Sequence, residues 1–318
     1  MSGSAGWALL VVAQGLVGLL LAPLLLGVTR RVKARLQYRR GPSLWQPYRD
    51  LAKWWRRLPV ESDAASPLSG LVPPAVLAVM VVSVFLVPLV GIHAPLGVLG
   101  DLLVVIGLLA LVRFLLALGA LDAGSAFGGM GAAREVAIAA IVEPALLLSL
   151  AVGVAAAGST DLGVIAAHSV SAGLSWLTPA VLLGAAAFLV VAVAETGHEP
   201  VDNPDTHLEL TMIHEGMILE ASGRRLAMLS YAAELKLVVV VGLFASVFLP
   251  FGAAAADTPG DLAVGMLAAG AKLVLAAVLL GVLDASVAKL RILALPSLMG
   301  VAALLALSGL GAQLWLPA

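Results

Sequence analysis

Long runs of apolar residues constrain the fold of this chain more than any other feature of its sequence. A helix needs roughly 20 apolar residues to cross a hydrocarbon core about 30 Å thick. Eight runs meet or approach that length: 7–29, 71–92, 98–120, 136–157, 178–194, 226–251, 262–283 and 297–316. The fifth run is the shortest, and the apolar segment 162–170 either extends it or lies at the membrane interface. We therefore predict an all-α, polytopic membrane protein in which residues 1–318 form one transmembrane domain of about eight helices.

The composition excludes several other classes of protein. Only 12% of the residues are charged, whereas soluble domains carry about 25%. The net charge of -1 gives no support for nucleic-acid binding. Cysteine is absent, so the chain has no thiolate for a disulfide, a zinc site or an iron–sulfur cluster. We therefore predict that this chain holds no cofactor and no metal. If the protein takes part in redox chemistry, its partner subunits carry the electrons.

Basic residues alternate between the connections that join the apolar runs. The segment 30–57 holds ten of the 18 basic residues. Further Lys and Arg residues occur in the third, fifth and seventh connections, and the second, fourth and sixth contain none. Because Lys and Arg collect in cytoplasmic loops, we predict that both termini face outward. The charges follow the first run rather than precede it, which is the reverse of a cleaved signal peptide. The chain is thus expected to be a multi-pass protein of the inner (plasma) membrane.

The first inner loop, residues 30–66, is strongly basic and contains an amphipathic segment. Trp45, Tyr48, Ala52 and Trp55 follow steps of three or four residues, and charged residues occupy the other side. Pro47 suits the first turn of a helix. Two interpretations remain open for this surface helix. It either anchors the chain among lipid headgroups or forms a docking surface for a cytoplasmic partner.

The third inner loop, residues 122–135, is rich in glycine and leads into the fourth apolar run. We discount a phosphate cradle, because no strand precedes the glycines and no Lys-Ser/Thr pair follows them. Small residues for close helix packing explain them better. Glu143 lies within the run, eight residues after Glu135 and next to Pro144. A carboxylate inside lipid is costly, so we expect Glu143 to have a functional role.

The fifth inner loop, residues 195–223, is acidic. It contains no Lys or Arg, and its carboxylates are Glu195, Glu199, Asp202, Asp205, Glu209, Glu215 and Glu220. Asn203 and Pro204 are typical of a helix start, and we expect that helix to end at Ser222. The loop is either a solvated acidic segment or, given its interspersed apolar residues, a covered row of carboxylates. Crowded carboxylates in a partly dry setting cannot all ionise, so the second interpretation predicts a proton relay.

Three basic residues lie inside apolar runs: Arg113, Lys236 and Lys272. The first two are close enough to the inner surface to extend partly toward water. Lys272 lies near the bilayer midplane and needs a carboxylate, backbone carbonyls or water. A structural ion pair and a place in a proton path are equally open for Lys272.

The loop motifs resemble those of one family over essentially the whole chain. YRRGP at 38–42, QPYRDLAK at 46–53, GSAFGGMGAAREVAIAAIVEPALL at 124–147 and the acidic stretch at 194–223 are similar to the complex I subunit 1 superfamily. They look most like its hydrogenase branch, the formate hydrogenlyase subunit 4 proteins of group 4 membrane-bound [NiFe] hydrogenases. The quinone-reducing branch carries a longer glycine-rich segment after RRGP, and the short segment here favours a hydrogenase-type partner.

The resemblance implies roles for individual residues. Glu143 and Glu195 match membrane carboxylates that line the family's route between the redox module and the ion path. Asp202, Glu209 and Glu220 match acidic positions of that same route, and we add Asp205, Glu215 and Lys272 from the local arguments above. The predicted interface with peripheral subunits consists of Arg39, Arg40, Arg49, Arg134 and Arg291.

The resemblance implies a non-catalytic subunit of an oxidoreductase complex. Such a chain anchors a cytoplasmic hydrogenase module and links it to proton or sodium translocation. Its expected partners are the hydrogenase large and small subunits, which would hold the [NiFe] and iron–sulfur centres, the antiporter-like membrane subunits and the lipid bilayer. The alternatives are a quinone-chamber subunit of a proton-pumping NADH:quinone dehydrogenase, a purely structural anchor and, more weakly, a stand-alone transporter.

Overall fold

The computed structural model describes residues 2–60, 62, 65–202, 212–256 and 258–315. Within these ranges every regular element is a helix, and β-pairing is limited to two isolated bridges. Seven helices are long and apolar enough to cross a membrane, or eight if one bent pair forms a single span. The predicted all-α polytopic fold is therefore confirmed, while the orientation of the termini remains a prediction.

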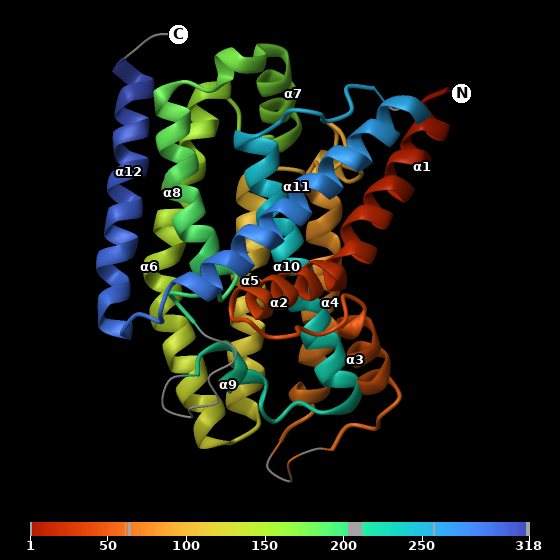
Figure 1. Ribbon diagram of the computed structural model, residues 1–318, viewed down its shortest axis with the longest axis vertical. Helices are drawn as coiled ribbons and strands as arrows, with labels where there is room; N and C mark the ends of the chain where they lie inside the picture. Colours follow the sequence, from red (N-terminus) through yellow and green to blue (C-terminus); the bar gives the residue numbers. More distant parts are fainter. Residues whose placement is uncertain (1, 61, 63–64, 203–211, 257, 316–318) are drawn as a thin grey trace.

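The helices form an elongated bundle with short helices at both ends (Figure 1). The long helices are α1 (Ser2–Gly15), α2 (Leu21–Leu36), α4 (Leu68–Leu86), α5 (Leu102–Asp122), α6 (Ala126–Ala157), α8 (Pro179–Glu195), α10 (Gly223–Phe248), α11 (Pro259–Ser286) and α12 (Leu295–Trp315). The short helices are α3 (Gln46–Trp55), α7 (Leu162–Ala172) and α9 (His214–Ile218). Since α3 and α9 lie at the same end of the bundle, we call it the α3–α9 end.

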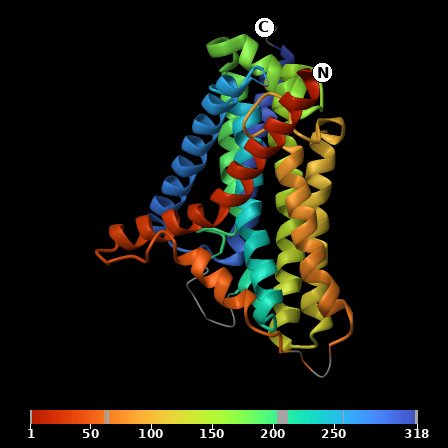
Figure 2. The same ribbon diagram turned by 90° about the vertical axis from the view of Figure 1, so that its right-hand side faces the viewer.

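The first span contains a break. A π-helical turn, η1 (Leu16–Leu20), separates α1 from α2, and after it the chain turns sideways away from the bundle (Figure 2). Pro23 has no amide hydrogen, so the carbonyl of Leu19 loses its usual donor one turn later. The Tyr231 hydroxyl donates to that carbonyl at 2.8 Å. Helix α2 continues to Leu36, past the predicted end of the run, and has the basic residues Lys33 and Arg35 in its last turn.

Helix α11 crosses the bundle diagonally and packs against α2 (Figure 1). Gly281 allows the close approach, because a Cβ atom there would lie 2.8 Å from the backbone oxygen of Thr29. The Thr29 hydroxyl donates to the carbonyl of Ala277 at 3.1 Å. The contact brings the end of α11 beside the basic part of α2.

The predicted inner loop 122–135 is mostly helical. Ser125 caps α6 by accepting a hydrogen bond from the Gly128 amide at 3.1 Å, so α6 begins ten residues before the predicted fourth run. A Cβ atom on Gly131 would lie 3.0 Å from the backbone oxygen of Ile213. The glycines of this segment therefore permit close packing of α6 against α9 and the residues before it.

The fifth apolar run and the segment before it form the bent pair. Helix α7 and the 3₁₀ turn Gly173–Trp176 meet α8 at an angle of 116°. Helix α7 lies at the end of the molecule opposite α9 (Figure 1). The segment 162–170 therefore does not prolong α8 as a straight helix.

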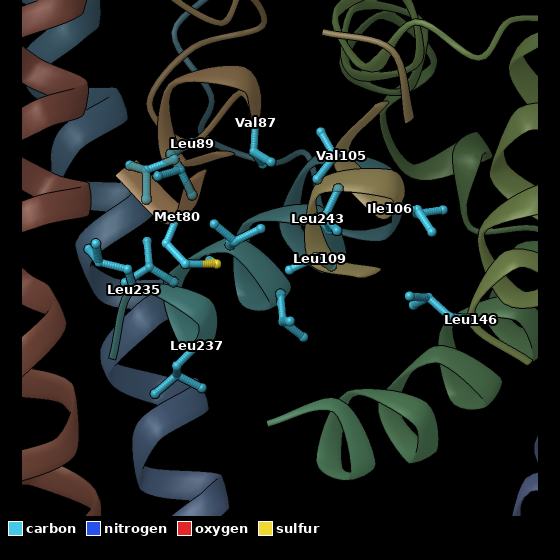
Figure 3. Packing of buried hydrophobic residues seen from close by; sticks show 14 of the residues in the cluster. Met80, Val87, Leu89, Val105, Ile106, Leu109, Leu146, Leu235, Leu237 and Leu243 are labelled. Atoms are coloured by element: carbon cyan, nitrogen blue, oxygen red, sulfur yellow. The ribbon is translucent and has the colours of Figure 1, made fainter. Parts of the chain in front are cut away.

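Helix α10 is the central helix of the bundle. In its most apolar stretch 67% of the residues are buried, against 28% for α12. Leu235 and Leu243 of α10 pack close to Met80 of α4 and Leu109 of α5 (Figure 3). Helix α10 is therefore the element against which the surrounding spans, and their charged side chains, are positioned.

Candidate functional site

The most concentrated set of charges lies among the apolar spans and centres on Arg113 of α5. This side chain is only 6% exposed and forms ion pairs with three carboxylates. Its Nε lies 3.5 Å from Oε1 of Glu135, and its two terminal nitrogens contact Glu143 and Glu195. A guanidinium group suits this position because its donors are arranged in a planar fork and it keeps its charge when buried.

Glu195 is held by a second cation as well. It is the last residue of α8, its side chain is fully buried, and its Oε1 lies 3.0 Å from Nζ of Lys236 on α10. We call Arg113, Glu135, Glu143, Glu195 and Lys236 the Arg113 cluster. It combines three carboxylates with two cations, so one negative charge is uncompensated when all five groups are ionised. Breaking a buried pair of this kind by removing one partner typically costs about 3–5 kcal/mol.

The helix geometry explains why these residues meet. Glu135 and Glu143 are eight residues apart on α6, slightly more than two turns, so both side chains face the same neighbour, α5. Glu143 has 35% of its side chain exposed and Glu195 has none. The cluster therefore runs from a partly accessible carboxylate to a fully enclosed one.

A second set of charges holds the beginning of the acidic loop. It consists of Lys33, His198, Glu199, Asp202, Asp284 and Lys289, which we call the loop clamp. Lys33 pairs with Glu199 at 3.5 Å, and Lys289 pairs with Asp202 at 2.8 Å. Asp284 accepts the Glu199 amide at 3.2 Å and contacts Nδ1 of His198 at 2.9 Å. The clamp ties the loop to α2 and to the end of α11.

A cavity joins the two sets of charges. Glu135, Glu195 and Lys236 of the Arg113 cluster line it together with Asp202 and His214. Asp202 also accepts the backbone amide of His214 at 3.2 Å, which fixes the start of α9 at the cavity. A buried water needs two to four polar partners, and the carboxylates and amine along this cavity supply them. The arrangement is chemically suited to pass protons between the cluster and the loop.

The structure brings together only some of the predicted pathway residues. Glu143 and Glu195 belong to the Arg113 cluster, and Asp202 lies on the connecting cavity. Glu215 is on α9, and the exposed Glu220 lines a different cavity with Arg225. Asp205 and Glu209 lie outside the described residues. The predicted helix was expected to reach Ser222, but in its described part the only helix is α9, which ends at Ile218.

Lys272 is placed apart from these carboxylates. Its Nζ donates to the backbone carbonyl of Leu249 at 2.6 Å. The carbonyl belongs to Leu249, the capping residue that follows α10, where intrahelical donors are missing. Of the partners that the sequence left open, a backbone carbonyl is therefore the one observed.

The predicted interface arginines differ in their exposure to solvent. Arg39, Arg40, Arg49 and Arg291 are exposed. Arg134 is partly buried and donates to the backbone oxygen of Met212 at 2.9 Å, so it fastens α6 to the segment before α9. Helix α3 forms as expected, with Trp45 and Trp55 both more than half exposed.

Several residues of the site were not selected from the sequence. Glu135 was overlooked although its spacing from Glu143 places both on one helix face. Asp284 was overlooked because it lies near a helix end, where a charge is ordinary. The partners of Arg113 and Lys236 became visible only in the structure, since they come from helices distant in sequence.

The fold and these buried charges define a polytopic membrane subunit. The family model described as NADH dehydrogenase matches residues 8–313, and the chain belongs to that family. It is 38% identical to formate hydrogenlyase subunit 4 of Escherichia coli strain K12, over 88% of this chain and 90% of the relative. It is also 39% identical to hydrogenase-4 component C of the same organism, over 76% and 75% of the two chains.

A more distant relative supports the same class, and a solved structure supports the same fold. An NADH-quinone oxidoreductase subunit of Thermomicrobium roseum is 32% identical over 76% of this chain and 79% of its own. A chain of the membrane-bound sulfane sulfur reductase, an archaeal respiratory membrane complex, superposes with a TM-score of 0.78. The match covers 97% of this chain and all of that one, at 21% identity. The protein is thus a membrane subunit of a respiratory-type complex, and such subunits have partners.

Proposed function

We propose that this chain is the membrane anchor and coupling subunit of a membrane-bound hydrogenase or formate hydrogenlyase complex. It docks a redox module at the α3–α9 end, which faces the cytoplasm of a cell whose inner membrane it spans. The hydrogenase large and small subunits hold the [NiFe] and iron–sulfur centres, and antiporter-like subunits continue the ion path. The relatives at 38–39% identity support the choice of partner.

One observation carries the coupling role: buried carboxylates and their cations continue from the Arg113 cluster through the cavity to Asp202. Arg113 contacts three carboxylates at once. A shift of its guanidinium toward one of them leaves the others with less compensating charge, and these then bind a proton. The loop clamp connects that shift to the segment nearest the docked module. A redox event in the module thereby changes proton occupancy among the membrane helices.

Replacing Glu143 by Gln tests the coupling role. In inverted membrane vesicles that contain the assembled complex, we expect E143Q to reduce ion movement per turnover by tenfold or more while subunit association persists. The matched control is D261N, because Asp261 is an exposed acid at the start of α11. Unchanged ion movement in E143Q would contradict the coupling role and favour a purely structural anchor.

Quinone reduction is the second candidate, favoured by the relative that carries quinone in its name. In that case the cavities near the α3–α9 end would accept a quinone headgroup. Inhibition of the assembled complex by quinone-site inhibitors, with turnover dependent on added quinone, would support this candidate. Full activity without any quinone would exclude it.

A further inference from the structure

Helix α11 is a largely exposed span that carries a cation at its middle. It lies along one side of the bundle (Figure 2), and only 22% of its most apolar stretch is buried, the smallest share among the seven spans found in the described residues. Lys272 is the 14th of its 28 residues, about 20 Å along the helix from either end. A hydrocarbon core is about 30 Å thick. Lys272 is therefore placed inside the hydrocarbon, away from the lipid headgroups at both surfaces.

Lys272 lies where the buried side of α11 meets the exposed side. Ala269 and Leu273 are buried against the bundle. Leu275 and Leu279 follow Lys272 by three and seven residues, so they share its face of the helix, and they are 58% and 59% exposed. Lys272 itself is partly exposed. We call Lys272, Leu275 and Leu279 the Lys272 face; it is an apolar surface with one cation at its edge.

The charge of Lys272 is not balanced by this chain. Among the described residues it forms no ion pair, and its Nζ donates to the carbonyl of Leu249. The end of α10 supplies roughly half a negative charge at most. The carboxylates of α11, Asp261 and Asp284, are 11 and 12 residues away from Lys272, about 16–18 Å along the helix. The carbonyl thus satisfies a hydrogen bond, but a cation in hydrocarbon still lacks an anion.

We propose that the Lys272 face docks a membrane-spanning helix of another subunit, and that an Asp or Glu at the middle of that helix pairs with Lys272. Lipid phosphates lie at the membrane surfaces, so a carboxylate on a helix is the anion that reaches this depth. The exposed leucines pack against apolar side chains of the partner and keep water from the pair, which strengthens the attraction between the two charges. The inference uses the class of the protein, a membrane subunit with partners, and does not rest on the proposed function.

Photo-crosslinking from the Lys272 face tests the identity of the occupant. The variant Leu275→p-benzoylphenylalanine retains Lys272 and is placed in membranes that contain the assembled complex. We expect a crosslink to a membrane subunit, within an apolar run that contains Asp or Glu. The control position is Val274, which is exposed at the same depth but lies about 200° around the helix from Lys272, and it should not give that crosslink. Crosslinks only to lipid, to a second copy of this chain or to a run without a carboxylate would overturn the proposal.

Removing the cation tests the ion pair. In detergent we expect the crosslinked subunit to dissociate from the K272M complex about fivefold faster or more, the factor that corresponds to the loss of one modest interaction. K272R retains the charge and should dissociate close to the unmodified rate, as should the control V274M. An unchanged rate in K272M would overturn the proposal. If K272M does not assemble, the crosslink from position 275 still decides, because Lys272 is intact in that variant.

A double-mutant cycle tests whether the two charges act as a pair. Replacing the partner's carboxylate by the corresponding amide should speed dissociation as much as K272M does. Combining the two changes should add little to either one, because each removes the same interaction. Additive effects would overturn the ion pair.

The docking role and the proposed function fail in distinguishable ways. In the bilayer the other contacts hold the partner, so we expect K272M to keep ion movement per turnover within about twofold in inverted vesicles. Reduced ion movement in E143Q, together with unchanged dissociation in K272M, would overturn the docking proposal and leave the proposed function intact. Faster dissociation in K272M, together with normal ion movement in E143Q, would support docking and contradict the proposed function.

Discussion

The buried carboxylates on the two faces of α10 have different surroundings. Lys236 on one face meets Glu195, which Arg113 also contacts. Glu234 on the other face has an oxygen without a partner among the residues that the structure describes. On the first face the buried carboxylate is paired with two cations, and on the second the structure shows no ion pair for the buried carboxylate among the residues that it describes. The difference teaches that a substitution on the first face affects a network of charges, whereas a substitution of Glu234 affects one enclosed side chain.

Removing Arg113 is expected to produce the largest effect. R113L leaves three carboxylates near one remaining cation, and we expect a loss of about 3–5 kcal/mol of stability. Thermal unfolding of the purified complex measures the loss. The double variant R113L/E195Q removes the most deeply buried carboxylate as well and should recover part of it. Equal stability of R113L and the unmodified chain would show that the charges are not ionised together.

A smaller loss is expected when Lys236 is replaced. K236M removes one of the two cations at Glu195 but leaves the other, so we expect a cost of about 1.5–3 kcal/mol, the usual range for a hydrogen bond to a charged group. A double-mutant cycle with E195Q measures the coupling between the two side chains. A coupling energy near zero would mean that Lys236 faces water rather than Glu195 in the native protein.

The packing of α9 beside the Arg113 cluster depends on Gly131. A Cβ atom there would lie 3.0–3.1 Å from backbone atoms of Ile213, Gly216 and Met217, so G131A is expected to cost about 1–3 kcal/mol through overpacking. Gly129 has open space at the same position. The control G129A should therefore be neutral or gain up to about 1 kcal/mol from helix propensity. Similar stability for both variants, measured by thermal unfolding, would contradict the close approach of α6 and α9.

Lys272 is expected to give the smallest effect on coupling. Its amine is satisfied by the Leu249 carbonyl and is not among the residues of the Arg113 cluster. We expect K272M to change the ratio of ion movement to turnover by less than twofold, and K236M to change it more. If K272M uncouples as strongly as K236M, Lys272 belongs to the path as its sequence position predicted.

The sequence predicted the charged residues of the site better than it predicted their partners. Glu143 and Arg113 stand out because a charge within an apolar run is unusual, and Glu195 stands out as the first carboxylate of the acidic loop. Glu234 was overlooked although it lies within such a run, because a carboxylate two residues from Lys236 resembles a locally balanced pair of charges. The contact of Arg113 with Glu195 joins residues 82 positions apart, and no local pattern in the sequence specifies such a pair.

The sequence by itself determined the type of the spans and their approximate number, about eight against seven or eight in the structure, because a hydrocarbon core demands about 20 apolar residues and a backbone that satisfies its own hydrogen bonds. Local capping and spacing also determined α3. Only the tertiary structure decided that α6 starts before Glu135, that α2 and α11 cross, and that α10 separates two differently compensated faces. These features depend on contacts between segments that are far apart in the sequence. Whether a charge is buried and paired depends on which other helix lies beside it.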